Sequence, residues 1–223
     1  MAITNMKNIE LLQQLASDNN LELDYLTDGS PIFQNKKLYT FTSDSVVLAR
    51  FVDEDKIEHL VDFCSGSGIV GLEVAGRVKV SKLSQFEIQK ELSDVAMLTA
   101  KYNETNTQIN VYNESLENAN CFVEDVDVVV CNPPYFKKGS GKVNQSSSKS
   151  LARHELSITL EDIFISAEKI LKPNGSLYFI HIIEREKEMT KLAKKYNFEE
   201  EKKLVLEGNK LIRFIIKYTK KMK

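Results

Sequence analysis

The chain has 223 residues, 42% of them hydrophobic, which is enough for one sizeable domain with a short appendage. Its 30 Lys and Arg and 32 Asp and Glu give a net charge of −2, which excludes nucleic-acid binding driven by overall charge and leaves only a local basic patch. The sequence contains neither the apolar run of a signal peptide nor about 18 consecutive apolar residues, the length of a membrane helix, so we expect a cytoplasmic protein with no membrane span.

The beginning of the chain is predicted to be an extension that precedes a nucleotide-binding fold. Residues 5–20 have apolar positions at helical spacing and predict a short amphipathic helix. Two apolar segments, 31–33 and 38–41, flank a polar stretch and fit a hairpin. We expect residues 1–40 to cover the active site of a domain that spans residues 41–223.

A strand, a glycine-rich turn and a helix start follow one another from Ile57 onward. The strand ends in an acid, Asp62, and the turn carries Gly66, Gly68 and Gly71 in G-x-G-x-x-G spacing. Glycines at these positions let the backbone approach a ligand closely, and the helix start offers backbone amides. The segment therefore predicts a nucleotide-type cofactor at the end of this strand.

A second acid fits a ribose but leaves two cofactors open. Glu87 follows the strand-like segment 80–86, where a carboxylate can accept hydrogen bonds from both ribose hydroxyls. A dinucleotide and S-adenosylmethionine (SAM) both carry such a ribose. Asp62 favours SAM, because a pyrophosphate prefers exposed amides with no nearby anion, whereas an acid suits the ammonium group of the methionine end. A dinucleotide-dependent oxidoreductase stays the competing interpretation.

Two consecutive prolines end a strand that is predicted to be buried on both faces. Residues 127–131 are mostly β-branched, and proline cannot continue a central strand. Because a residue before proline is extended, the Asn132 side chain and the Pro133 carbonyl become neighbouring hydrogen-bond acceptors, and Tyr135 and Phe136 offer aromatic faces next to them. Two acceptors beside two aromatic planes suit a flat ring that carries an amino group.

A basic segment follows this motif directly. Residues 137–153 contain five basic residues and no acid, among several Gly and Ser residues. A solvated flexible loop is one explanation. A cationic loop next to a target site could also follow a phosphate backbone, with each contact adding to the salt dependence of binding.

The remainder of the chain alternates helix and strand. A capped amphipathic helix is predicted over 159–172, a turn over 173–175 and an apolar strand over 176–181. A charged helix over 184–196 follows. Two final strands are predicted to form a terminal hairpin, 203–206 with 211–217.

With the glycine turn and Asn-Pro-Pro-Tyr at this spacing, the chain resembles the Rossmann-like SAM-dependent methyltransferases that methylate amino groups. The stretch 152–155, Ala-Arg-His-Glu, and the span from Tyr39 to about Glu188 resemble the bacterial tRNA adenine methyltransferases that modify position 37, beside the anticodon. This resemblance implies an α/β fold with a mostly parallel seven-stranded sheet, an antiparallel last strand and helices on both faces. It also implies SAM as cofactor, the anticodon region of tRNA as partner, and methylation of N6 of a flipped adenine.

The resemblance assigns roles to individual residues. Catalytic roles fall to Asn132, Pro133, Pro134 and Tyr135. Cofactor-binding roles fall to Thr42, Asp44, Asp62, Cys64, Gly66, Gly68, Glu87, Ser115 and Asn132. Substrate-binding roles fall to Tyr135, Phe136, Lys137, Lys138, Lys142, Arg153 and His154. For Asp44, capping of a helix is the alternative. Ser115 stands where relatives usually have an acid near the adenine of the cofactor, and Glu114 is the alternative there. His181 stands where relatives often have a His-Arg pair, but Ile182 replaces the Arg.

Other acceptors of the methyl group stay open on sequence grounds. Methylation of DNA adenine, rRNA guanine or a protein glutamine uses the same motif, although glutamine methyltransferases of release factors carry a larger helical N-terminal domain. A SAM-binding protein without activity is a further alternative. The three cysteines, Cys64, Cys121 and Cys131, lack Cys-x-x-Cys spacing, so we expect reduced thiols and no metal site, and we expect a monomer.

Overall fold

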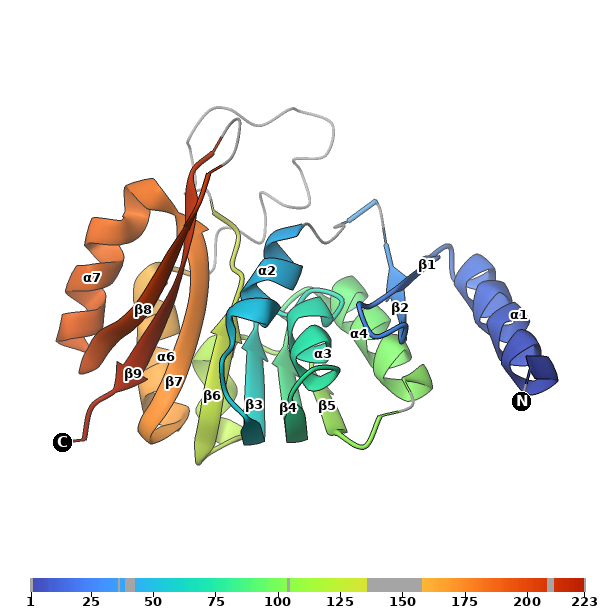
Figure 1. The fold of residues 1–223 in the computed structure, drawn as a ribbon, viewed down its shortest axis with the longest axis horizontal. Coiled ribbons are helices and arrows are strands. Elements are labelled where there is room, and N and C mark those ends of the chain that lie inside the picture. The colour runs from blue at the N-terminus through green and yellow to red at the C-terminus, as the bar shows by residue number, and fades with distance from the viewer. Residues whose placement is uncertain are drawn as a thin grey trace.

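The computed structural model shows a seven-stranded sheet with helices on both of its faces (Figure 1). The described residues are 2–35, 37–38, 43–103, 105–135, 158–207 and 211–222, with side chains described from residue 9 onward.

The strands of the large sheet lie in the order β5-β4-β3-β6-β7-β9-β8. Their bounds are β3 Lys56–Phe63, β4 Lys79–Phe86, β5 Gln108–Tyr112, β6 Val126–Cys131, β7 Leu171–Ile182, β8 Phe198–Leu206 and β9 Arg213–Lys220. The first five in spatial order are parallel, and β9 is inserted antiparallel between β7 and β8. This order confirms the predicted fold, and the β8–β9 pairing confirms the predicted terminal hairpin.

Helices cover both faces of this sheet. They are α2 Ser43–Phe51, α3 Ile69–Ala75, α4 Lys90–Tyr102, α6 Leu160–Ile170 and α7 Glu186–Lys195, with 3₁₀ helices η1 Leu116–Cys121 and η2 Ile183–Arg185. A further helix, α1 Ala2–Asp18, packs on the N-terminal hairpin. One buried cluster joins α2 and α3 to the sheet, and another joins α6, α7 and η1 to the opposite face. Successive residues of β3, Leu60 and Val61, contribute to different clusters, because neighbouring side chains of a strand point to opposite faces.

The register of the central strands brings three chain segments together. Phe63, the last residue of β3, is in register with the last residues of both β4 and β6. The residues that follow these strands, Cys64, Glu87 and Asn132, therefore meet at one edge of the sheet. In an open parallel sheet this carboxyl edge is where ligands bind.

The N-terminal segment contains a hairpin, whereas most of the segment 38–41, the predicted partner of 31–33, lies outside the described residues. Pro31–Gln34 forms β2, which pairs antiparallel with the preceding β1, Glu22–Tyr25. The pairing places Leu23 opposite Phe33, and both belong to the apolar cluster between α1, the hairpin and α4. A bond from Phe33 N to Thr99 Oγ1 at 3.1 Å ties the hairpin to α4, whereas α1 projects at one end of the molecule (Figure 1). The boundary at residue 40 stays a prediction.

The predicted turn at 173–175 lies inside a strand instead. In the pairing of β6 with β7, Val126 faces Leu171 and Val128 faces Ser176, so β7 has several extra residues at this point. Asn174 has a φ of 63°, a left-handed conformation that Asn tolerates, and it allows the strand to bulge and then continue.

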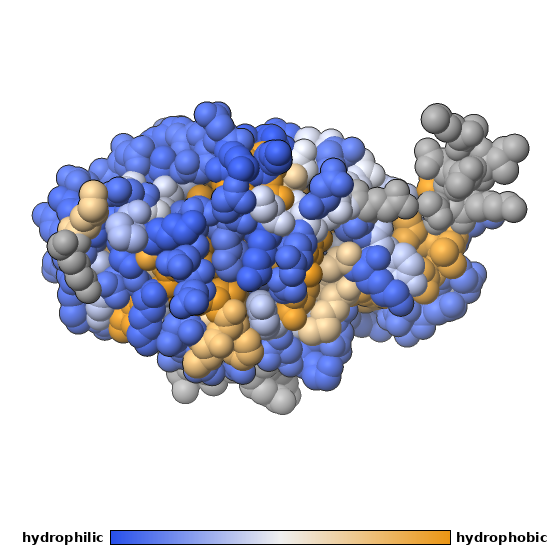
Figure 2. Space-filling model, turned by 90° about the horizontal axis from the view of Figure 1, so that it is seen from below, coloured by the Kyte–Doolittle hydropathy of each residue, from blue (hydrophilic) through white to orange (hydrophobic). Residues whose placement is uncertain are grey.

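The edge of the sheet opposite to the carboxyl ends is predominantly hydrophilic (Figure 2). Its cavity of about 250 Å³ is lined by charged residues that include Lys56, Glu58, Asp127 and Lys172. In the part of the chain that the structure describes, no helix is both long and apolar enough to cross a membrane.

Candidate active site

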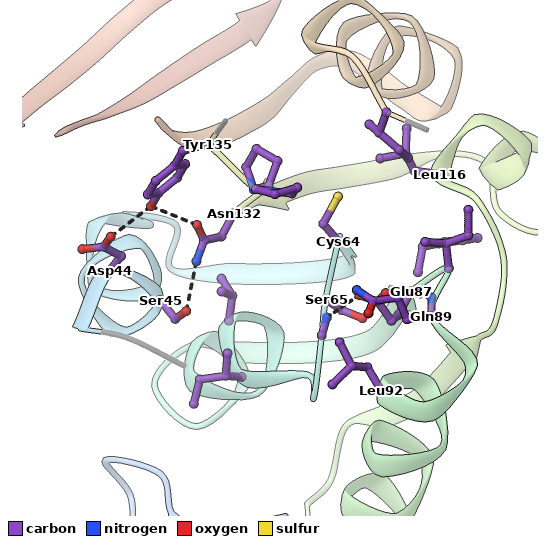
Figure 3. Close-up of a pocket in the computed structure, with 18 of the residues that line it drawn as sticks. Asp44, Ser45, Cys64, Ser65, Glu87, Gln89, Leu92, Leu116, Asn132 and Tyr135 are labelled. Atoms are coloured by element: carbon purple, nitrogen blue, oxygen red, sulfur yellow. Dashed lines mark hydrogen bonds between the residues drawn. The ribbon is translucent and has the colours of Figure 1, made fainter. Parts of the chain in front are cut away.

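A cavity of about 410 Å³ opens at the carboxyl edge of β3, β4 and β6 (Figure 3). Its volume lies within the range of about 300–1,000 Å³ that small-molecule sites occupy. The lining is formed by Leu38, Asp44, Ser45, Cys64, Ser65, Gly66, Ile69, Val70, Phe86, Glu87, Ile88, Gln89, Leu92, Glu114, Leu116, Asn132, Pro133, Pro134, Tyr135, Ile158 and Arg213. The segments that the sequence predicts to bind a cofactor and to methylate therefore share one cavity.

The glycine turn has a conformation and a spacing that require Gly68. Gly68 has a φ of 91°, and a Cβ atom on it would lie 2.6 Å from Gln85 Nε2. The Gln85 side chain in turn donates to the carbonyl of Gly68 at 3.0 Å. Gly68 therefore packs against Gln85 and does not line the cavity. Gly66, with a φ of 57°, does line it.

Glu87 lies where the ribose-binding acid was predicted. Its carboxylate is buried at the cavity wall and accepts hydrogen bonds from Gly66 N at 2.9 Å and Gln89 N at 2.8 Å. Asn113 donates to the backbone carbonyl of Glu87 at 3.0 Å. These bonds fix the acid between the glycine turn and the start of α4.

Asp62 is fully buried beneath the glycine turn and does not line the cavity. Its Oδ2 accepts from Gly71 N at 2.9 Å, and its Oδ1 has no hydrogen-bond partner in the described part of the chain. Burial raises the pKa of Asp62 to about 7, the negative charge of Glu87 adds to this shift, and the bond from Gly71 opposes it. The predicted contact of Asp62 with the ammonium group of SAM therefore stays a prediction.

The Asn132 side chain is held between α2 and Tyr135. Asn132 Nδ2 donates to Ser45 Oγ at 3.0 Å, and the Tyr135 hydroxyl lies 3.2 Å from Asn132 Oδ1 and 3.0 Å from Asp44 Oδ2 (Figure 3). The structure thus gives the Asp44 carboxylate a contact with the motif, in addition to its place in the first turn of α2. Pro133 is buried and Pro134 is exposed, and both line the cavity.

The Tyr135 ring packs beside His181, whose role the sequence left undefined. The two ring centroids are 5.4 Å apart at an angle of 53°. Burial lowers the pKa of His181 to about 4, and the charge of Arg185 contributes to this shift. His181 is therefore neutral near pH 7, and its backbone neighbour Ile182 N donates to its Nδ1 at 2.9 Å.

At the end of β5, Glu114 lines the cavity and Ser115 does not. The Ser115 hydroxyl instead caps η1 by accepting from Glu117 N at 3.3 Å. Glu114 Oε1 accepts from Ser115 N at 3.0 Å and from Asn118 Nδ2 at 3.2 Å. This placement favours Glu114, the alternative named from the sequence, as the acid nearest the predicted adenine end.

Cys64, with a φ of 55°, also lines the cavity.

Sequence reasoning missed Ser45 and Arg213. Arg213 begins β9, yet its Nη1 donates to both carboxylate oxygens of Asp44, at 2.6 and 2.8 Å. Only the insertion of β9 beside β7 brings the two residues together, and no local pattern signals it. Ser45 follows Asp44 and could have been suspected from the sequence, since a hydroxyl one residue further along a helix start can face a ligand.

Several predicted site residues lie outside the described residues. They are Thr42, Phe136, Lys137, Lys138, Lys142, Arg153 and His154. Among the described residues, no group of three or more His, Cys, Asp or Glu side chains could hold a metal ion.

Comparisons with known proteins place these features in a family. The chain is 23% identical over 181 residues to a tRNA1(Val) (adenine(37)-N6)-methyltransferase of Dyadobacter fermentans, in a match that covers 79% of this chain and 73% of the relative. The proteins of the same name from Vibrio vulnificus and a Shewanella species are 24% and 30% identical over 139 and 142 residues. Those matches cover 62% and 60% of this chain but only 57% and 56% of the relatives.

Solved structures show the same fold at low sequence identity. TrmN from Thermus thermophilus has a TM-score of 0.57 and 18% identity, covering 79% of this chain and 48% of that protein. The tRNA m1G37 methyltransferase of M. jannaschii has a TM-score of 0.65 and 13% identity, covering 91% of this chain and 57% of that one. The model of the methyltransferase small domain matches residues 39–206, which is 168 of 223 residues. The chain therefore belongs to the methyltransferase small domain family.

Proposed function

We propose that the protein is a SAM-dependent methyltransferase that modifies the N6 amino group of an adenine in tRNA, at position 37 beside the anticodon. The observation that carries the proposal is the placement of the Asn132 amide in the same cavity as Gly66 and Glu87. An acceptor for an amino group thus lies across one cavity from a ribose-type site. The relatives described above are named as tRNA1(Val) (adenine(37)-N6)-methyltransferases, which agrees with this substrate.

The residues of the cavity fit SAM. A carboxylate has about four acceptor positions, so Glu87 can accept from ribose hydroxyls in addition to Gly66 N and Gln89 N. Apolar side chains, Phe86, Leu92 and Leu116 among them, suit the adenine ring. Ser65 adds a buried hydroxyl oxygen that has no partner among the described residues. When bound, SAM supplies an electrophilic methyl group on a positively charged sulfur.

The chemistry required of the protein centres on Asn132. The lone pair of an adenine amino group is delocalised into the ring, so the nitrogen is a poor nucleophile. Hydrogen bonds from its two protons to Asn132 Oδ1 and the Pro133 carbonyl favour a pyramidal nitrogen and stabilise the positive charge that grows on it. Holding the reactants in line contributes roughly 7–11 kcal/mol as effective molarity. Transfer of the methyl group would break the methyl–sulfur bond and leave a neutral thioether. One amino proton would then pass from the nitrogen to water, so no strong base is needed.

Base capture falls to Tyr135, the last residue of the motif, and RNA binding falls to the residues that follow it. Tyr135 is half-buried at the cavity, and stacking of a flipped base on its ring would contribute about 1–3 kcal/mol. Residues 136–154 supply the predicted aromatic and basic contacts to the RNA. We propose a monomer that acts in the cytoplasm, with residues 1–40 as the N-terminal extension.

A methylation assay tests the substrate directly. Purified protein is incubated with isotope-labelled SAM and, in separate reactions, with unmodified tRNA, ribosomal RNA, duplex DNA and a release factor. Mass spectrometry of the digested products should find label in N6-methyladenosine from tRNA alone. Label confined to another acceptor would overturn the tRNA assignment, and binding of NAD but not SAM in calorimetry would overturn the cofactor.

A further inference from the structure

An ion pair lies directly behind the Asn-Pro-Pro-Tyr motif. Arg213 Nη1 donates to both oxygens of Asp44, and the two side chains are only 25% and 6% exposed. Asp44 comes from α2 and Arg213 from β9, so the pair connects two elements that are far apart in the sequence. Beyond the cofactor contact that the family resemblance implies for Asp44, the methyl transfer proposed above gives this pair no task.

Two acceptors among the described residues lie within reach of the Tyr135 hydroxyl, which has only one proton to donate. The hydroxyl is 3.0 Å from Asp44 Oδ2 and 3.2 Å from Asn132 Oδ1. A hydrogen bond to a carboxylate is roughly twice as strong as one to a neutral amide. The paired bonds from Arg213 also keep the carboxylate in place for this contact. The phenol proton therefore goes to Asp44.

This choice determines the state of the Asn132 oxygen. The amide is oriented with Nδ2 on Ser45, so Oδ1 faces the Tyr135 oxygen and the cavity. When the phenol proton lies on the Asp44 side, Oδ1 receives no hydrogen bond from Tyr135. Asn132 Oδ1 is then held in a fixed position with its lone pairs open, so it can accept a hydrogen bond from an incoming amino group.

We propose that Asp44 and Arg213 are positioning residues, which draw the Tyr135 proton away from Asn132 and so keep the Asn132 oxygen open to the amino group of the substrate. This inference rests on the proposed function. Without Arg213, the Asp44 carboxylate loses its anchor, and Tyr135 donates to Asn132 instead. The amide oxygen has two lone pairs, so the amino group must then share it with the phenol, and the bond that it donates to this oxygen is weaker and less well aligned.

A double-mutant cycle in single-turnover methylation of tRNA tests this proposal. The variants are Arg213→Gln, Tyr135→Phe and the pair together, at saturating SAM and tRNA. We expect Arg213→Gln to slow methylation roughly tenfold or more when Tyr135 is present. In the Tyr135→Phe protein no phenol competes for Asn132, so the same change should alter the rate by no more than about twofold. Arg213→Lys, which keeps the charge, should restore part of the rate.

Controls separate positioning from folding and from cofactor binding. Lys172→Gln breaks an ion pair with Asp127 at the opposite edge of the sheet and should leave the rate unchanged. SAM affinity of Arg213→Gln should stay within about twofold of the unmutated protein. An equal rate loss from Arg213→Gln with and without the Tyr135→Phe change, whatever the melting temperature, would overturn the positioning role. An unmutated protein that does not methylate tRNA would overturn the proposed function, and this inference with it.

Discussion

Asp62 illustrates how burial changes the behaviour of a single acid. Its pKa is raised from 3.8 to about 7, so the folded protein binds this proton more tightly than the unfolded chain does. Such a group contributes stability at low pH that is lost as the pH rises through the folded pKa. Asp62→Asn removes the titration while keeping an oxygen that can accept from Gly71.

We expect the free energy of unfolding of the unmutated protein, relative to Asp62→Asn, to fall by on the order of 1–4 kcal/mol between about pH 4 and pH 7. Urea unfolding of both proteins across this pH range measures the difference. A difference that does not change with pH would show that Asp62 titrates at its ordinary value.

Gly68 and Gly29 form a matched pair for testing the close approach in the glycine turn. Both have positive φ angles, 91° and 86°, but a Cβ on Gly29 would meet nothing within 4 Å, whereas one on Gly68 would meet Gln85 at 2.6 Å. Gly29→Ala should therefore cost only the backbone strain, on the order of 1 kcal/mol. Gly68→Ala should cost an additional 1–3 kcal/mol or so, because it also overpacks the turn. Equal losses in thermal unfolding would contradict the importance of this contact.

At the residue scale, the sequence indicated which side chains share a cavity better than it indicated their contacts. Asn132, Glu87 and Gly66 line one cavity because each lies just after a strand whose hydrophobic pattern is plain, and their roles stay predictions. Asp62 ends its strand as predicted, but strand alternation turns it beneath α3 and away from the cavity wall. Its side-chain direction depends on which face α3 covers, which local pattern does not reveal.

At the scale of elements, strands and helices with strong periodicity were predicted closely, while connections were not. β4 ends at Phe86, as predicted from the segment 80–86, and β6 ends one residue before Asn132. The predicted turn after α6 became a bulge, because strand pairing with β6 resumes at Ser176. In the N-terminal hairpin, β2 pairs with β1 in the register that buries Leu23 and Phe33 together against α4.

The role of the basic segment 137–153 is tested by its effect on the salt dependence of tRNA binding. Replacing Lys137, Lys138 and Lys142 with Gln should weaken tRNA binding and reduce the slope of log affinity against log salt by roughly two to three, at about 0.7–0.9 per lost phosphate contact. SAM affinity should not change. Replacing Lys56, Lys79 and Lys172 removes the same charge elsewhere and is the control. Identical slopes for the two triple variants would mean that the segment does not touch phosphates.

At the scale of the whole molecule, the site depends on the order of the strands. The insertion of β9 between β7 and β8 brings Arg213 to Asp44, 169 positions earlier in the chain. The fold class was predictable because alternating strands and helices with a glycine turn leave few topologies, and the resemblance to a family supplied the antiparallel strand. A local sequence pattern could not predict a contact between residues so far apart in the chain, because the contact depends on the position of β9 in the sheet.

We propose that Asn132 acts directly on the amino group being methylated. Its side chain is half-buried, donates to Ser45 and lies 3.2 Å from the Tyr135 hydroxyl, so Asn132→Ala should remain folded, with a stability loss of about 1–2 kcal/mol. The decisive measurement is the single-turnover rate of tRNA methylation by Asn132→Ala, with the melting temperature of the same preparation. We predict near-normal SAM and tRNA binding with methylation slowed about a hundredfold or more. A stable Asn132→Ala protein that methylates tRNA at the normal rate would contradict the assignment.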